Sequence, residues 1–167
     1  ALGHRHVELA SKLLVGADGP EALNRNLAAL CAKAVLDLPE QAETDEGRQR
    51  DAVLRWLNRH AGWLLILDNI DTEAAARAAE ALLPRLGGGH VLLTSRLPNW
   101  SAGIQAVPVG LLPPRDAADF LLSRTAGRRR HEPDDDAVAA HLADELGCLA
   151  LGLEQAGAYI AQRRSTF

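Results

Sequence analysis

The sequence of 167 residues contains no methionine and only two lysines, Lys12 and Lys33. Arginine supplies the remaining basic side chains, and this bias, with the abundant Ala, Leu and Gly, is typical of a GC-rich bacterial genome. Because the chain starts at Ala1 and has no methionine, we expect a fragment or a processed chain. Any phosphate-binding loop that depends on lysine has only these two candidates.

Cysteine and long apolar runs are also scarce. Cys31 and Cys148 lie far apart in segments with helical periodicity, so we expect small core residues rather than a disulfide or a metal pair. No apolar run approaches the roughly 20 residues of a membrane span, and no signal peptide is visible. We therefore expect a cytoplasmic protein without membrane contact. No Gly-x-Ser-x-Gly sequence and no Cys/His pair at catalytic spacing is present.

The charge balance bears on the class of partner. A formal net charge of −4 argues against a general nucleic-acid surface. A basic run, Arg128–Arg130, precedes an acidic one, and we interpret this stretch as a solvated loop rather than a phosphate or nucleic-acid site, because no aromatic residues interleave. His4 and His6 flank Arg5 and are interpreted as a frayed terminus rather than a metal site.

Short apolar runs alternate with helical patterns in the first two thirds of the chain, which predicts a parallel α/β sheet. Asp18 is expected to cap the first helix, with Pro20 in its first turn. The run 63–67 has no polar alternation, as expected for a strand covered on both faces. The predicted strands are 9–17, 63–67, 90–96 and a shorter one at 104–110, and the predicted helices of this part are 18–34, 47–60 and 72–86.

The pattern changes at about Gly110. From there on, three helices are predicted, at residues 113–126, 134–147 and 149–164, with no further strand. At 47% hydrophobic residues, the chain can bury a core. We therefore predict an α/β part followed by an all-helical part.

Polar residues end two of the apolar strands, where parallel sheets bind ligands. Asp68 would supply the hard oxygen ligand that Mg²⁺ prefers, although it could instead cap the following turn. Thr94, Ser95 and Arg96 end the next strand, and the Arg96 guanidinium suits a terminal phosphate, although a lone arginine is commonly an ordinary surface residue.

Four motifs follow in a fixed order: "LLILDNID", "LLTSR", "VPVGLLPPRDAADFLL" and "LGCLALGLEQAGAYI". Together they resemble the NB-ARC family of STAND-class signal-transducing NTPases, especially bacterial members that precede tetratricopeptide repeats. In that family they correspond to the Walker B motif, the sensor arginine, the hinge and the Gly-Leu-Pro-Leu motif. The resemblance covers roughly Leu9 to Ile160. It implies a P-loop NTPase-like parallel sheet flanked by helices over residues 1–110, with the first strand missing, and a helical lid subdomain over 111–167.

The resemblance also implies a function and a site. Such a protein is a nucleotide-dependent signalling switch: ADP holds a closed state, and ATP opens the protein for self-assembly or contact with protein partners. The cofactors would be ATP or ADP with Mg²⁺, which Asp68 would bind through water. The nucleotide-binding residues implied are Asp68, Asn69, Thr94, Ser95, Arg96, Leu149 and Ala150.

Several parts of the family pattern are missing. Neither Lys12 nor Lys33 lies in a Gly-x-x-x-x-Gly-Lys-Ser/Thr loop, and Gly87–Gly89 precedes a strand rather than a helix. Ala150 replaces the proline of the last motif. Asn69 replaces a second acid that the resemblance assigns to the attacking water, and an amide cannot accept that proton.

We therefore expect no catalytic residue and no ATP hydrolysis by the isolated chain. The alternative is a degenerate, non-catalytic scaffold for protein interactions. A motor-type ATPase acting on nucleic acid is disfavoured by the acidic balance. The missing strand is expected to lie between the Asp68 and Arg96 strands, so that the two strands pair directly or the chain pairs with itself, with residues 1–7 as a possible edge.

Overall fold

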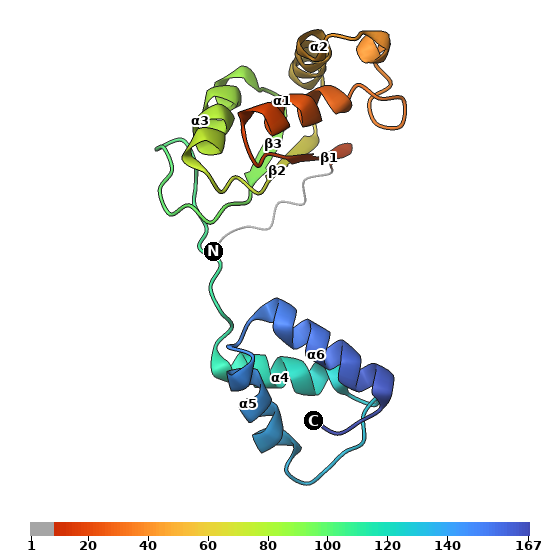
Figure 1. Cartoon of the computed structure of the whole chain (residues 1–167), viewed down its shortest axis with the longest axis vertical. Coiled ribbons are helices and arrows are strands. Elements are labelled where there is room, and N and C mark those ends of the chain that lie inside the picture. The colour runs from red at the N-terminus through yellow and green to blue at the C-terminus, as the bar shows by residue number, and fades with distance from the viewer. Residues whose placement is uncertain (1–8) are drawn as a thin grey trace. The chain divides into compact units, whose positions relative to one another are not determined.

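The computed structural model describes residues 9–167 and divides into two compact units, with the division between Gln105 and Ala106 (Figure 1). Each unit is described by itself. The histidine pair His4 and His6, and the edge expected from residues 1–7, lie outside the described residues.

The first unit contains a parallel sheet of three strands in the order β1-β2-β3. The strands are β1 (Ser11–Gly16), β2 (Trp63–Asp68) and β3 (His90–Leu93). The strand that ends in Asp68 is therefore central, and the strand that leads to Arg96 pairs with it directly. Of the two alternatives for these strands, direct pairing is therefore the one that the structure shows.

Three helices cover one face of this sheet (Figure 1). They are α1 (Pro20–Ala29), α2 (Glu46–Arg59) and α3 (Glu73–Leu82), with short 3₁₀ turns at Pro39–Ala42 and Leu83–Arg85. The strand order explains this one-sided arrangement. Both crossovers step across the sheet in the same direction, and right-handed crossovers that step in one direction place their helices on the same face.

Local sequence signals fix where these helices begin. The Asp45 carboxylate accepts hydrogen bonds from the amides of Gly47 and Arg48, and the Thr72 hydroxyl accepts one from the Ala75 amide. Pro20 occupies the first position of α1, as predicted. The expected Asp18 cap was wrong: Gly19 holds that position, and the Asp18 side chain is engaged elsewhere.

The core of the first unit lies between the helices and the covered face. Alternate side chains of β1 and β2 point into it, which agrees with the two-residue period of a strand. The fully buried side chains with the largest volumes in this core are Trp63, Leu27, Leu57, Leu65, Leu67, Ile70, Val15 and Val53.

Gly89 explains part of the glycine run before β3. A Cβ atom at this position would lie 2.1 Å from Cδ2 of the Trp63 indole, so only glycine fits against the ring. Gly88 has φ +87°, and a Cβ there would meet the His60 carbonyl oxygen at 2.7 Å. The run therefore serves packing around Trp63, in line with a loop rather than a phosphate-binding turn.

The opposite face of the sheet is open. Leu14 and Leu92 are 66% and 51% exposed, and Leu64 and Ile66 between them are half-buried. The prediction that residues 63–67 are covered on both faces was therefore wrong for the part of the chain that the structure describes. An unbroken apolar strand predicts that both faces are covered, but it does not identify the element that covers each face.

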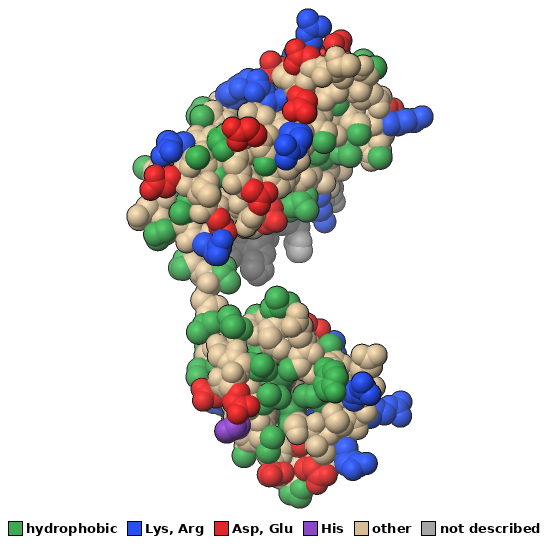
Figure 2. All heavy atoms as spheres, viewed as in Figure 1, with side chains coloured by type: hydrophobic (Ala, Val, Ile, Leu, Met, Phe, Trp, Pro, Cys, Tyr) green, Lys and Arg blue, Asp and Glu red, His purple; other side chains and the backbone are tan. Residues whose placement is uncertain are grey.

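The second unit is a three-helix assembly of α4 (Pro114–Thr125), α5 (Asp135–Glu145) and α6 (Ala150–Arg163). Its core consists of Ala117, Leu121, Ala139, Ala143, Cys148 and Leu153. Hydrophobic side chains also gather on the visible surface of this unit (Figure 2). Within residues 9–167, no helix combines the length and the apolarity that crossing a bilayer requires.

The strand predicted at residues 104–110 was wrong, because that segment has no regular structure. Val107 and Val109 are 74% and 94% exposed. Pro108 between them has no N–H to give to a ladder, which weakens strand pairing here. Cys31 and Cys148 are buried free thiols, as the sequence predicted.

Candidate functional site at the strand ends

The carboxyl ends of the three strands bring polar residues together at one edge of the sheet. Gly16 pairs with Asp68, and Leu67 pairs with Leu93, so the loops that follow all three strands begin side by side. The backbone joins two of these loops: the Ile70 amide donates to the Thr94 carbonyl over 3.0 Å. This is the edge at which parallel sheets bind ligands.

Asp68 and Thr94 are in direct contact across the sheet. The Thr94 hydroxyl donates to Oδ1 of Asp68 over 2.5 Å and accepts from the Asn69 amide over 2.9 Å. Asp68 and Thr94 are both exposed. The hydroxyl therefore orients the carboxylate, and the second carboxylate oxygen has lone pairs left for a ligand.

Asn69 connects this pair to β1. Its side-chain amide donates to the carboxylate of Asp18, two residues beyond the end of β1. Asn69 has φ +66°, a left-handed conformation that asparagine tolerates better than most residues. The sequence analysis missed the role of Asp18, although the parallel order of neighbouring strands places the residues just after β1 beside those just after β2.

Arg96 is held by Asp71 through both its backbone and its side chain. The Arg96 amide donates to Oδ1 of Asp71 over 2.8 Å, and Nε donates to Oδ2 over 2.5 Å. The backbone N–H of Arg96 is the main cause that holds the pKa of Asp71 below its usual value, and the guanidinium adds to it against the opposing effect of burial. The sequence analysis missed this carboxylate as the partner of Arg96.

Arg96 nevertheless remains open to a ligand. Its side chain is 85% exposed, whereas that of Asp71 is 14% exposed. Only Nε is engaged by Asp71, so the outer nitrogens of the guanidinium keep their donors. Ser95 points the other way, because its hydroxyl donates to the Ile70 carbonyl and accepts from the Leu97 amide. Its role is to hold the loop.

The donor set suits a magnesium ion only in part. Within residues 9–167, no group of three or more His, Cys, Asp or Glu side chains converges to hold a metal ion. Asp68 alone offers an exposed carboxylate of the kind that binds Mg²⁺ together with water and phosphate oxygens. A phosphate group would therefore have to supply further ligands.

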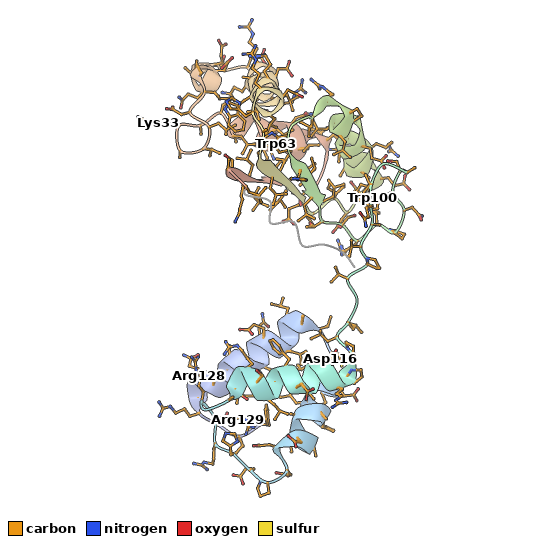
Figure 3. All side chains as sticks on the ribbon, turned by 180° about the vertical axis from the view of Figure 1, so that it is seen from behind. Lys33, Trp63, Trp100, Asp116, Arg128 and Arg129 are labelled. Carbon is orange, nitrogen blue, oxygen red and sulfur yellow. The ribbon has the colours of Figure 1, made fainter. Side chains whose placement is uncertain are left out.

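Neither lysine reaches this edge. Lys12 is the second residue of β1, at the opposite end of the strand. Lys33 lies on the opposite side of the unit from Trp100, which follows the carboxyl end of β3 (Figure 3). Among the described residues, Arg96 is therefore the cation that the strand ends contribute.

Two hollows lie elsewhere in the first unit. One, of about 310 Å³, lies along α2 and the Leu83–Arg85 turn, and the other, of about 90 Å³, lies among α1, α2 and α3. Their linings include none of the strand-end residues. The candidate site is thus an exposed edge and not an enclosed pocket.

The remaining predicted residues belong to the second unit. Leu149 is the N-cap residue of α6 and is 56% exposed, and Ala150 is the first residue of the helix. Arg129 is buried (Figure 3): its guanidinium donates to Thr125 and Asp135 and lies 4.4 Å from the centre of the Phe167 ring. This arginine holds the helical unit together. The interpretation of the basic run as a solvated loop is confirmed for Arg128 and Arg130, which are exposed, and was wrong for Arg129.

No known protein family matches the sequence, and no match was found among curated proteins.

Proposed function

We propose that this chain is the sheet-and-helix portion of a nucleotide-dependent signalling switch of the NB-ARC class, with ATP or ADP and Mg²⁺ as its cofactors. One observation carries the proposal. Asp68 is the last residue of β2, and the loop that carries Arg96 follows the neighbouring parallel strand β3. The hydroxyl of Thr94, in that loop, donates a hydrogen bond to Asp68. The two motifs that the resemblance assigns to magnesium and phosphate thus belong to one edge of the sheet.

In this proposal the acidic residue contacts the magnesium site and the basic residue contacts the phosphate. Asp68, oriented by Thr94, provides a carboxylate oxygen to magnesium-bound water. Arg96, held at Nε by Asp71, presents its outer N–H groups to a third phosphate. The resemblance also assigns Leu149 and Ala150, at the start of α6, to nucleotide binding. A bound Mg²⁺ would offset the negative charges of the carboxylates and of the phosphates.

Switching requires that ATP and ADP differ in affinity for the two states of the protein. A full shift from 1:99 to 99:1 needs about 5.5 kcal/mol of differential binding. A charged contact that exists only with the third phosphate, such as one from Arg96, is the kind of interaction that separates the two nucleotides. Because Asn69 cannot act as a base and no lysine reaches the edge, the isolated chain binds without hydrolysing.

The alternative is a non-catalytic scaffold for protein interactions. The contact between Asp71 and Arg96 favours it, because a carboxylate already compensates the cation that a phosphate would use. Exposed leucines on the sheet point the same way. A scaffold binds neither nucleotide at the strand ends.

A titration of the labelled chain with magnesium and ATP or ADP, followed by amide NMR shifts, tests the proposal. We expect shifts at Asn69, Thr94 and Arg96, and a weaker affinity in Asp68→Asn, which keeps the acceptor for Thr94 but removes the charge. Asp144→Asn, an exposed acid on α5, is the matched control and should bind as the wild type does. Absence of shifts at the strand ends would favour the scaffold.

A further inference from the structure

The larger hollow of the first unit, between α2 and the Leu83–Arg85 turn, is lined mainly by cations. Its volume of about 310 Å³ lies at the lower end of the range of small-molecule sites, about 300–1,000 Å³. Three arginines, one carboxylate, one amide and one apolar side chain form the lining: Asp51, Leu54, Arg55, Asn58, Arg59 and Arg85. The formal charge of the lining is therefore +2. We refer to it as the arginine hollow.

Neighbouring acids engage these arginines only in part. Oδ1 of Asp51 accepts from Nε and Nη2 of Arg50, which lies outside the lining, over 3.2 and 2.9 Å. Nη2 of Arg85 lies 3.7 Å from the same oxygen, which is longer than a hydrogen bond. Only Nη2 of Arg55 donates to Glu40, over 2.7 Å, so its other N–H groups keep their capacity to donate.

Arg59 is the most available of the three cations. Within residues 9–167, its exposed guanidinium takes part in no ion pair and no side-chain hydrogen bond. It follows Arg55 by four residues on α2, a spacing that places both side chains on one face of the helix. A basic residue in a last turn also stabilises the helix end, but that role does not require a second arginine from another element.

Asn58 holds the two sides of the hollow together. Its Nδ2 donates to the carbonyl of Leu54 over 2.8 Å and to the carbonyl of Arg85 over 2.7 Å. The second bond joins α2 to the Leu83–Arg85 turn. The backbone positions that carry the arginines are therefore fixed before a ligand arrives, which lowers the entropy lost on binding.

The charge and the shape of the lining select a phosphate group. A phosphate monoester carries about −1.5 to −2 charges at pH 7 and three acceptor oxygens, which matches a lining of +2. Guanidinium groups also present paired N–H donors that fit phosphate oxygens. A carboxylate would leave a surplus of positive charge. A nucleic-acid strand is disfavoured because the lining has no aromatic side chain for base stacking.

We infer that the arginine hollow binds the phosphate dianion of a small molecule, with Arg55, Arg59 and Arg85 as the residues that contact it. Asn58 is a positioning residue that holds Arg85 beside α2. The lining shares no residue with the strand ends, so the inference does not depend on nucleotide binding there.

An NMR titration that follows the arginine Nε–H signals tests this site. The probes are inorganic phosphate and glycerol phosphate, at an ionic strength held constant with sodium chloride because exposed charges are screened by salt. We expect saturable shifts at Arg55, Arg59 and Arg85. Tighter binding of glycerol phosphate would identify a phosphomonoester as the ligand, and equal binding would identify free phosphate; both results support the site.

Arginine variants make the result specific. Arg59→Gln and Arg85→Gln should each weaken phosphate binding about two- to fivefold, the range for exposed charge pairs, and the double variant should weaken it further. Arg77→Gln is the matched control, because Arg77 lies on α3 outside the lining and its side chain is 70% exposed. Urea midpoints from tryptophan fluorescence establish that each variant folds, and Arg55→Gln replaces one that does not.

The pH dependence tests the charge of the ligand. Because a phosphate monoester loses its second proton at about pH 6, binding of glycerol phosphate should strengthen between about pH 5 and pH 7. Sulfate stays divalent over this range and should gain no affinity. It also controls for the protonation of His60, which follows Arg59 and would favour anions at low pH.

Four outcomes would overturn the inference. Shifts that do not saturate, or that sodium chloride alone reproduces, would show general screening. An affinity unchanged in the double variant, or one that Arg77→Gln weakens equally, would show that the hollow is not the site. Glycerol phosphate binding that does not strengthen with pH would exclude the dianion. Tighter binding of a single-stranded oligonucleotide than of glycerol phosphate would identify a nucleic-acid backbone as the ligand.

Discussion

Replacement of Gly89 by alanine tests the packing of the first unit at its tightest contact. A Cβ atom at this position would lie 2.1 to 2.4 Å from three carbon atoms of the Trp63 indole. Trp63 is 1% exposed, and its Nε1 donates to the carbonyls of Leu57 and His60 over 2.8 and 3.1 Å. The ring cannot move away without lengthening these bonds and displacing its neighbours.

The magnitude follows from three contributions. Overpacking a filled core costs about 1–3 kcal/mol. Leaving a buried donor unsatisfied costs about 1–3 kcal/mol more. The lower entropy of unfolded alanine, compared with glycine, offsets about 0.4–1 kcal/mol. We therefore expect Gly89→Ala to lower the free energy of unfolding of the first unit by about 3 kcal/mol, which is a large part of a typical domain's stability.

Urea unfolding followed by tryptophan fluorescence measures this change. Trp56, Trp63 and Trp100 all lie in the first unit, so the emission reports on that unit alone. Gly103→Ala is the control, because a Cβ at Gly103 meets no atom within 4 Å, and it should be close to neutral. A Gly89→Ala protein within about 0.5 kcal/mol of the wild type would refute the packing argument, since ordinary surface substitutions have effects of that size.

Other predictions concern chemistry and pH. The purified chain should release no phosphate from ATP above a boiled control, and turnover abolished by Asp68→Ala would contradict this. In carboxyl NMR, the pKa of Asp71 should lie below that of a free aspartate. In Arg96→Gln this pKa should rise only partly, because the backbone N–H of residue 96 remains. An ordinary pKa of Asp71 in the wild type would be inconsistent with the structure. Burial alone would raise the pKa of Asp135, but the hydrogen bonds from Arg129 and the Glu132 amide together outweigh it, so this pKa is also lowered. The stabilisation that Asp135 gives the helical unit should therefore be complete above the pKa of an unfolded aspartate and lost as the pH falls through the lowered value. Circular dichroism of Asp135→Asn should show a weaker acid dependence of unfolding, and an unchanged one would refute that role.

Secondary structure was accessible from the sequence because it depends on local patterns. The apolar run from Trp63 predicted β2, and alternating helical periodicity predicted α1, α2 and α3 to within a few residues. The strand order was not accessible, because periodicity carries no information about which strands are neighbours. The uncovered face was missed for a related reason: apolar residues alone do not identify what covers them.

The strand-end residues could be predicted only in part. The parallel-sheet rule indicated Asp68 and the Thr94–Arg96 segment, and the structure brings their loops together. The contact of Arg96 with Asp71 depends on the path of the loop after β2, which no local pattern specifies. The contact of Asp18 with Asn69 could not be predicted from local patterns either. The local sequence suggested that Asp18 caps the first helix, but its carboxylate instead accepts a hydrogen bond from Asn69, which follows the neighbouring strand.

Discrimination between ATP and ADP at Arg96 is the most direct test of the proposed switch. The measurement is an NMR titration of the wild-type chain with each nucleotide and magnesium, following the side-chain Nε–H of Arg96 and the amide of Thr94. The account predicts that ATP shifts the Arg96 side chain, that ADP leaves it nearly unchanged, and that both nucleotides shift Thr94. Equal shifts of Arg96 with the two nucleotides, or no shift of either group, would contradict the account.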